Sequence, residues 1–217
     1  MNEDKSAIPK ITRPRVASSY HRTDLHNLLD EAYSRRLVVV SGPPETGKST
    51  LVATYIESRN LPSIWYQVDE GDNDLATFFH FFGIAARKAT PHNKAAMPHL
   101  PPEFFQDINA FAERYFREIY RYLEIPFLIV LDNYQDVAED AALHEAIRVA
   151  CIELPPGGRI VIISRKGCPT AMAKLRTNNK VAIIEWGELQ LTPNEMKALA
   201  ALHNLRLPSD ETAKEQL

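Results

Sequence analysis

The sequence predicts an α/β fold, a three-layer sandwich in which helices cover both faces of a mainly parallel sheet of about five strands. Short apolar runs recur along the chain, and stretches with helical periodicity separate them. Each run is apolar at consecutive positions rather than at alternate ones, which is typical of strands that are covered on both faces. Alternation of such strands with helices indicates parallel strand order.

The first half of the chain supplies two of the strands. Residues 24–34 predict a helix, since Leu25, Leu28 and Leu29 recur at helical spacing after Asp24. The uninterrupted apolar run 37–40 predicts the first strand. A glycine-containing loop and a helix over 49–59 follow it. A second strand is expected at 63–68, and an acidic loop separates it from a phenylalanine-rich helix at 75–88.

The second half repeats the alternation after a linker at 91–102. Helices are expected at 103–123 and 138–152, and strands at 127–131, 159–164 and 180–185. A last helix, to about residue 204, should begin after Thr192. That residue is a suitable cap, Pro193 fits the first helical position, and Glu195 completes a capping box. The polar tail 208–217 resembles a frayed or cut end.

Composition restricts the class of protein. The 217 residues carry a net charge of -3, so no global basic field attracts nucleic acid. Two cysteines without metal-type spacing, and no apolar leader or membrane-spanning run, predict a cytoplasmic protein that contacts no membrane.

The loop after the first strand carries the clearest functional pattern. Residues 42–49 read Gly-Pro-Pro-Glu-Thr-Gly-Lys-Ser and match G-x-x-x-x-G-K-[ST] at each defined position. Glycines let backbone N–H groups turn toward phosphate oxygens, Lys48 supplies a positive charge, and Ser49 offers a hydroxyl to Mg²⁺. The helix that follows adds its N-terminal N–H groups. We therefore predict a nucleotide site formed by Gly42, Pro43, Pro44, Glu45, Thr46, Gly47, Lys48, Ser49 and Thr50.

Two strand ends are candidates for catalysis. Asp132 ends the third strand, where a carboxylate can hold the Mg²⁺ that bridges two phosphates. Arg165 ends the fourth strand, where it can reach a γ-phosphate; a surface arginine is the plainer interpretation. Asn133 follows Asp132 and cannot take a proton from an attacking water, which favours slow hydrolysis.

The acidic loop after the second strand is a further candidate. Four acids occur within residues 69–74, and they repel one another unless a cation is near. A solvated loop is one interpretation. The other is that Asp69 and Glu70 reach the nucleotide, its Mg²⁺ or an attacking water, because ligands bind at this end of parallel sheets.

These motifs together resemble the nucleotide-binding domain of the signal-transduction ATPases with numerous domains, in the branch of maltose-activator-like, LuxR-type regulators. The resemblance spans nearly the whole chain. Its most specific part is Trp-Tyr-Gln-Val-Asp-Glu-Gly-Asp-Asn at 65–73; others are 11–15 with 20–22, 42–50, 131–135, 163–165 and 189–195. Asn133 and Gln135 depart from the pattern, which usually has aspartate and histidine there.

The resemblance implies a P-loop NTPase fold and a nucleotide switch. It implies that 1–23 is an extended segment whose Arg15 and Arg22 line the adenine pocket, that 24–187 is the nucleotide-binding domain, and that 188–217 begins a truncated helical domain. ATP or ADP with Mg²⁺ would be the ligands, and slow ATP hydrolysis would be coupled to self-association. Inducer and DNA would bind only through domains absent from this chain.

A small-molecule kinase of the P-loop class is the main alternative. Such an enzyme should have a substrate aspartate near the second strand, which the acidic loop partly provides, and an arginine-rich lid, which we do not find. A pure interaction module with a degenerate site is a weaker alternative, because Lys48, Ser49 and Asp132 are all intact.

Overall fold

The computed structural model describes residues 8–16, 19–90 and 107–202. The expected linker 91–102 and tail 208–217 lie outside the described residues, as does the start of the helix expected at 103–123. A five-stranded sheet in the order β2-β3-β4-β1-β5 forms the centre of the molecule, and all neighbouring strands are parallel. Its strands are β1 (Leu37–Ser41), β2 (Ser63–Gln67), β3 (Phe127–Asp132), β4 (Gly158–Ser164) and β5 (Val181–Ile184).

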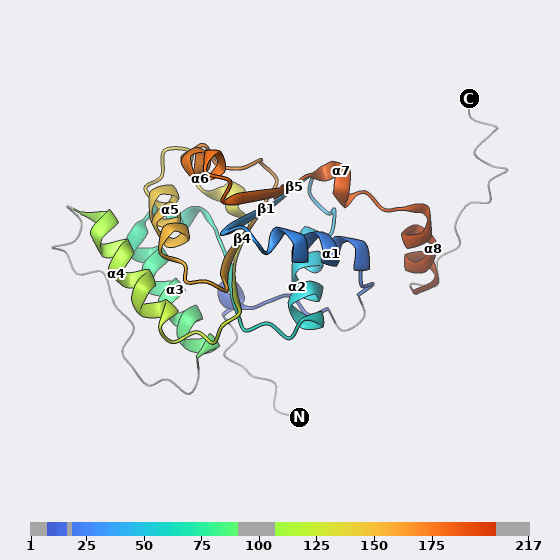
Figure 1. Cartoon of the computed structure of the whole chain (residues 1–217), viewed down its shortest axis with the longest axis horizontal. Coiled ribbons are helices and arrows are strands. Elements are labelled where there is room, and N and C mark those ends of the chain that lie inside the picture. Colours follow the sequence, from blue (N-terminus) through green and yellow to red (C-terminus); the bar gives the residue numbers. More distant parts are fainter. Residues whose placement is uncertain (1–7, 17–18, 91–106, 203–217) are drawn as a thin grey trace.

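Helices cover both faces of the sheet (Figure 1). One layer contains α1 (Thr23–Ala32) and α2 (Lys48–Ser58). The opposite layer contains α3 (Leu75–Ala89), α4 (Ile108–Tyr120), α5 (Leu143–Glu153) and the short α6 (Ala173–Thr177). Two further helices, α7 (Trp186–Leu189) and α8 (Pro193–Leu202), extend beyond β5. The predicted three-layer α/β sandwich is therefore confirmed.

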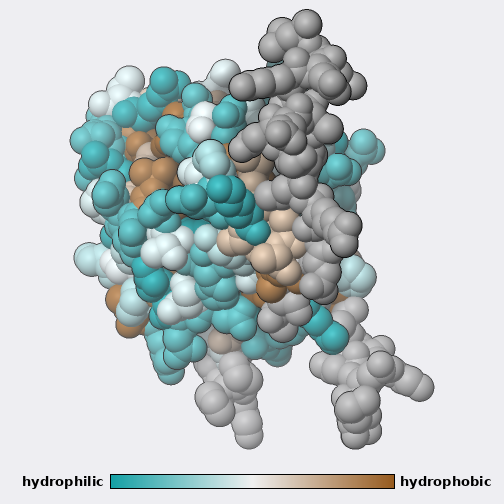
Figure 2. Space-filling view, turned by 90° about the vertical axis from the view of Figure 1, so that its right-hand side faces the viewer, coloured by the Kyte–Doolittle hydropathy of each residue, from teal (hydrophilic) through white to brown (hydrophobic). Residues whose placement is uncertain are grey.

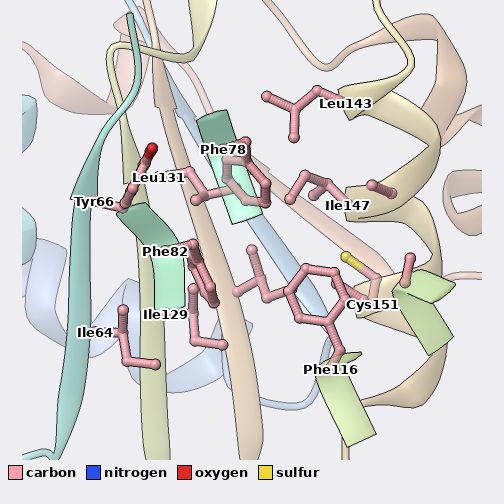
Figure 3. Packing of buried hydrophobic residues seen from close by; sticks show 14 of the residues in the cluster. Ile64, Tyr66, Phe78, Phe82, Phe116, Ile129, Leu131, Leu143, Ile147 and Cys151 are labelled. Atoms are coloured by element: carbon pink, nitrogen blue, oxygen red, sulfur yellow. The ribbon is translucent and has the colours of Figure 1, made fainter. Parts of the chain in front are cut away.

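Each strand divides its side chains between two hydrophobic layers. In β1, Leu37 and Val39 belong to the cluster under α3–α5, whereas Val38 and Val40 belong to the cluster under α1 and α2. This explains why the strands are apolar at consecutive positions, because both faces of the sheet are buried. The first cluster is rich in aromatic residues, and Phe78, Phe82 and Phe116 pack there against Ile129 and Leu131 (Figure 3).

The helix expected at 138–152 differs most from the prediction. The described helix begins only at Leu143, because the chain turns first: the Ala141 N–H donates to the Ala138 carbonyl at 3.0 Å. The Ala138 N–H in turn donates to the Asn73 side chain at 2.9 Å. This contact with a residue 65 positions away has no local sequence signal. Two short helices, α6 and α7, were likewise not expected.

Candidate functional site

The glycine-rich loop connects the end of β1 to the start of α2. Gly47 has a φ of 77°, a conformation that glycine adopts without strain, and Glu45 has a φ of 63°. Left-handed residues at these two positions curl the loop so that successive N–H groups form a concave surface for an anion. Gly42 packs closely against α7: a Cβ there would approach the Leu189 Cδ1 to 3.3 Å, so that the leucine side chain would have to shift slightly.

Lys48 is buried within this loop. Its Nζ donates to the carbonyl oxygens of Gly42 at 2.9 Å and Pro43 at 2.5 Å, and to the Thr46 hydroxyl at 3.2 Å. Burial lowers the pKa of the Lys48 ammonium, and the nearby positive charge of Arg165 lowers it further. An ammonium group held by weak carbonyl acceptors beside a second cation favours the arrival of a strongly anionic group.

Ser49 and Asp132 meet at the start of α2 and the end of β3. The Ser49 hydroxyl donates to Asp132 Oδ1 at 2.9 Å, and the backbone N–H of Asn133 donates to the same oxygen at 3.0 Å. Burial raises the pKa of the Asp132 carboxyl, and the Ser49 hydrogen bond opposes that shift. A carboxylate and a hydroxyl oxygen this close are the donors that a small divalent cation prefers, so these residues fit Mg²⁺.

Arg165 lies beside the loop because β4 is the neighbour of β1. Ser164 pairs in register with Ser41, and the Gly42 N–H donates to the Ser164 carbonyl at 3.3 Å. The backbone N–H of Arg165 donates to the Gln135 side-chain oxygen at 3.0 Å. Gln135, which departs from the family pattern, thus holds the segment that carries Arg165. Asn133 adopts a φ of 61°, a left-handed conformation that asparagine tolerates well.

A cavity of about 470 Å³ adjoins the loop on the side of α7 and α8. Such a volume and mixed apolar and polar walls are typical of a small-molecule site. On this side of the molecule hydrophobic residues reach a mostly hydrophilic surface (Figure 2), and Trp186 and Leu191 are among the exposed ones. The lining residues are Ser19, Tyr20, Arg22, Glu45, Thr46, Gly47, Thr50, Leu51, Trp186, Leu189, Leu191 and Leu199.

Arg22 lines this cavity, but its guanidinium is directed to α7 and α8. It donates to both carboxylate oxygens of Glu195, at 2.8 and 3.1 Å, and to the carbonyl oxygens of Leu189 and Gln190, each at 2.8 Å. Arg22 therefore fixes one wall of the cavity. No local sequence signal identifies Glu195 as the partner of Arg22, because the two residues are 173 positions apart.

Arg15 lies far from the loop. It lines a different cavity together with Glu57, near the end of α2, and Ser63, at the start of β2. These positions are at the end of the sheet opposite the loop, so the structure does not bring Arg15 to the predicted adenine pocket.

Asp69 and Glu70 follow β2, which is an edge strand. Three strand intervals separate β2 from β1, or roughly 14 Å. The Asp69 carboxylate pairs with Lys10 Nζ at 2.5 Å, and buried Asp72 pairs with the same amine at 2.9 Å. Asp72 also accepts from the Tyr66 hydroxyl at 2.7 Å. The structure thus supplies a cation for the acidic loop from the N-terminal segment, and Asp69 contacts that lysine rather than the phosphate loop.

Most of the chain is similar in sequence to one segment of known transcriptional regulators. It is 28% identical over 173 residues to the HTH-type transcriptional regulator MalT of Vibrio campbellii, and 30% identical over 174 residues to that of Vibrio cholerae. Each match covers 78% of this chain and 19% of the relative. MalT of Klebsiella pneumoniae is 26% identical over 190 residues, which cover 87% of this chain and 21% of the relative. The chain thus spans about a fifth of the length of these relatives.

Solved structures support the fold. A Walker-type ATPase of Pyrococcus abyssi superposes with a TM-score of 0.51 at 14% identity, covering 87% of this chain and 60% of that protein. No family model matches the chain. In the described ranges no helix is long and apolar enough to cross a bilayer. The chain therefore has a P-loop NTPase fold, and its sequence is similar to one segment of the MalT transcriptional regulators.

Proposed function

We propose that this domain binds ATP or ADP with Mg²⁺ and acts as the nucleotide switch of a longer transcriptional regulator. The observation that carries the proposal is the contact of Ser49 with Asp132 beside Lys48. Lys48 would attract the β- and γ-phosphates, and Ser49 with Asp132 would hold the metal. The cation would supply charge neutralisation for the phosphates.

The adjoining cavity supports a bound nucleoside. Tyr20 and Trp186 offer aromatic faces for a base, and Leu189 and Leu191 offer apolar ones. Thr50 lies at the boundary between this cavity and the loop. The preference for adenine over guanine rests on the resemblance to the MalT-like regulators.

A thermal-shift experiment tests this site. Wild-type protein should be stabilised by ATP and by ADP in the presence of Mg²⁺, by several degrees at saturation. Lys48→Ala should lose this shift, whereas Lys174→Ala, which changes an exposed lysine of α6, should retain it. Equal stabilisation of wild type and Lys48→Ala by ATP would contradict the assignment.

We further propose that hydrolysis is slow. Asn133 stands where an acid would polarise water, and it cannot accept a proton. Phosphate release should therefore be well below one per second, the low end of ordinary enzyme rates of about 1–1,000 per second. Turnover at or above that rate would contradict the switch interpretation, and Asn133→Asp is expected to accelerate release.

Self-association in the ATP state is the remaining part of the proposal, and it rests on the family resemblance. Sedimentation velocity with Mg-ATP and with Mg-ADP compares the two states directly. A larger species with ATP alone supports the coupling, and identical distributions would contradict it for this domain.

Among the described residues, no contact favours the small-molecule kinase. Asp69 and Asp72, which lie where a kinase would place a substrate aspartate, are bound to Lys10. A test of phosphoryl transfer to small hydroxyl compounds separates the two functions, since the switch predicts water as the only acceptor.

A further inference from the structure

A second cavity, of about 540 Å³, lies at the end of the sheet opposite the phosphate loop. It forms where the N-terminal segment passes the beginning of β2 and the C-terminal ends of α2 and α3. Its position is given by Ser63, the first residue of β2, by Glu57 near the end of α2, and by Ala89, the last residue of α3. This site is independent of the nucleotide site.

Positive charge gathers around this second cavity. Arg13, Arg15 and Lys88 line it, and Glu57 is the one acid among its lining residues. Within the described residues none of the three cations forms an ion pair with a protein carboxylate. The whole chain has a net charge of -3, so this concentration of cations is local. Arginine side chains present paired N–H donors that match the oxygens of carboxylates and phosphates.

Trp65, which carries an unpartnered hydrogen-bond donor, lines the same cavity. Trp65 is 4% exposed, and its indole Nε1 is buried without a hydrogen-bond partner among the described residues. No other buried side-chain nitrogen or oxygen of the described residues is in this state. A buried indole N–H ordinarily has an acceptor, because leaving it without one is costly. A residue that lacks a hydrogen-bond acceptor thus lines the cavity in which the three cations gather.

We propose that this cavity binds a small organic anion. Arg13, Arg15 and Lys88 would hold a carboxylate or phosphate group, and the Trp65 indole N–H would donate to one of its oxygens. The apolar part of the ligand would lie against Val16, Ala85 and Ala89, which also line the cavity. The volume is within the range of small-molecule sites, about 300–1,000 Å³.

The two tryptophans of the chain allow ligand binding at each site to be measured separately by fluorescence. Trp65 lines the second cavity and Trp186 lines the nucleotide cavity, and the chain contains only these two. In Trp186→Phe the emission therefore comes from Trp65 alone. Adding Lys48→Ala to this variant removes the phosphate-binding lysine, so that phosphate-containing probes report on the second cavity.

The experiment titrates this double variant with inorganic phosphate, succinate and 3-phosphoglycerate, against potassium chloride at matched ionic strength. We expect a saturable change in Trp65 emission with at least one probe and none with chloride. Replacing Arg13 and Arg15 by glutamine should weaken the apparent affinity by about tenfold or more, since hydrogen bonds to charged groups are lost. Arg87→Gln, which changes an exposed arginine next to Lys88, should leave it unchanged.

Two results would overturn the proposal: an unsaturated response to all three probes up to about 10 mM, well above a 1 mM dissociation constant, or the same affinity after both arginines are replaced. Circular dichroism establishes that each variant is folded. The Trp65→Phe variant leaves Trp186 to report nucleotide binding. A failure of the nucleotide switch is thereby distinguished from a failure of the anion site.

Discussion

At the scale of single residues, the metal-binding role proposed for Asp132 conflicts with the environment of its carboxyl group. Burial raises the pKa of its carboxyl, so the folded protein retains the proton over a pH range in which the unfolded chain has released it. The resulting stability is fully present below the ordinary aspartate pKa and is lost as the pH rises through the raised value. At neutral pH the ionised carboxylate is therefore a cost to the fold, which bound Mg²⁺ would offset.

Asp132→Asn should separate the cost of burying the carboxylate from the benefit of its binding to Mg²⁺. Without nucleotide at pH 7 the variant should melt higher than wild type, by roughly 2–4 °C, which corresponds to about 1 kcal/mol in a domain of this size. It should lose the additional stabilisation that Mg²⁺ gives to bound ATP, because the amide is a poor metal ligand. Differential scanning calorimetry with Mg²⁺ and with EDTA measures both. A variant that keeps the Mg²⁺-dependent gain would contradict the metal role.

Gln135 is the second residue whose role follows from one contact. Its side-chain oxygen accepts the Arg165 N–H at 3.0 Å and so fixes the segment beside the phosphate loop. We predict that Arg165 contacts the γ-phosphate and so favours ATP over ADP. Gln135→Leu should reduce this preference toward the value of Arg165→Ala, with ADP affinity nearly unchanged. Gln135→Glu retains an acceptor oxygen and should preserve the preference. Isothermal titration with both nucleotides tests this, and an unaltered ATP-to-ADP ratio in Gln135→Leu would exclude a positioning role.

At the scale of elements, the cavity wall formed by α7 and α8 depends on Arg22. The capping box expected for α8 is present: the Thr192 N–H donates to Glu195 at 2.8 Å, and the Glu195 N–H donates to the Thr192 hydroxyl at 3.2 Å. The carboxylate of Glu195 also forms an ion pair with Arg22. A single side chain therefore caps α8 and attaches it to the start of α1. The Arg22 hydrogen bond holds the pKa of Glu195 below its usual value.

Removal of the Glu195 carboxylate should detach α8 from α1 and lower the local stability of the helix. In Glu195→Ala, amide exchange in α8 should be about fivefold faster or more, equivalent to ~1 kcal/mol of local stability. Because the pKa of Glu195 is depressed in the folded protein, its pairing with Arg22 contributes its full stability above the ordinary glutamate pKa. This stability is lost as the pH falls through the lowered pKa. The amide-exchange rate of α8 in the wild type should therefore approach that of the variant only at acidic pH. Lys197→Ala, at an exposed position on the same helix, serves as the control, and equal exchange in all three proteins would rule out the attachment.

The same elements show what a sequence reveals and what it does not. The strands, the loop at 42–49 and the capping box of α8 were predictable because each is encoded by neighbouring residues. The Arg22–Glu195 pair and the distance of Asp69 from the loop were not, because they depend on strand order and on contacts between remote segments. The adjacency of Arg165 to the loop was one of two interpretations of its place at a strand end, and the pairing of β4 with β1 explains it physically.

At the scale of the whole molecule, the N-terminal segment closes an open edge of the sheet. β2 has one strand neighbour, and exposed edges of this kind promote unwanted pairing with other chains. The 3₁₀ helix at Pro9–Ile11 packs beside β2, and Lys10 anchors it through Asp69 and Asp72. Lys10 Nζ also lies 5.4 Å from the centre of the Tyr66 ring. The acidic motif that follows β2 is thus bound to the first described segment of the chain.

Lys10→Met should therefore weaken the entire fold, because it leaves the Asp72 carboxylate buried without its cation. Asp72 is fully buried, and breaking a buried pair from one side costs about 3 kcal/mol or more. Urea denaturation should show this loss in the free energy of unfolding, whereas Lys174→Met, on the exposed surface of α6, should change it by less than about 0.5 kcal/mol. Adding Asp72→Asn to Lys10→Met should recover part of the loss, since the neutral amide can still accept from the Tyr66 hydroxyl. A Lys10→Met protein as stable as wild type would show that the segment is not held by this ion pair.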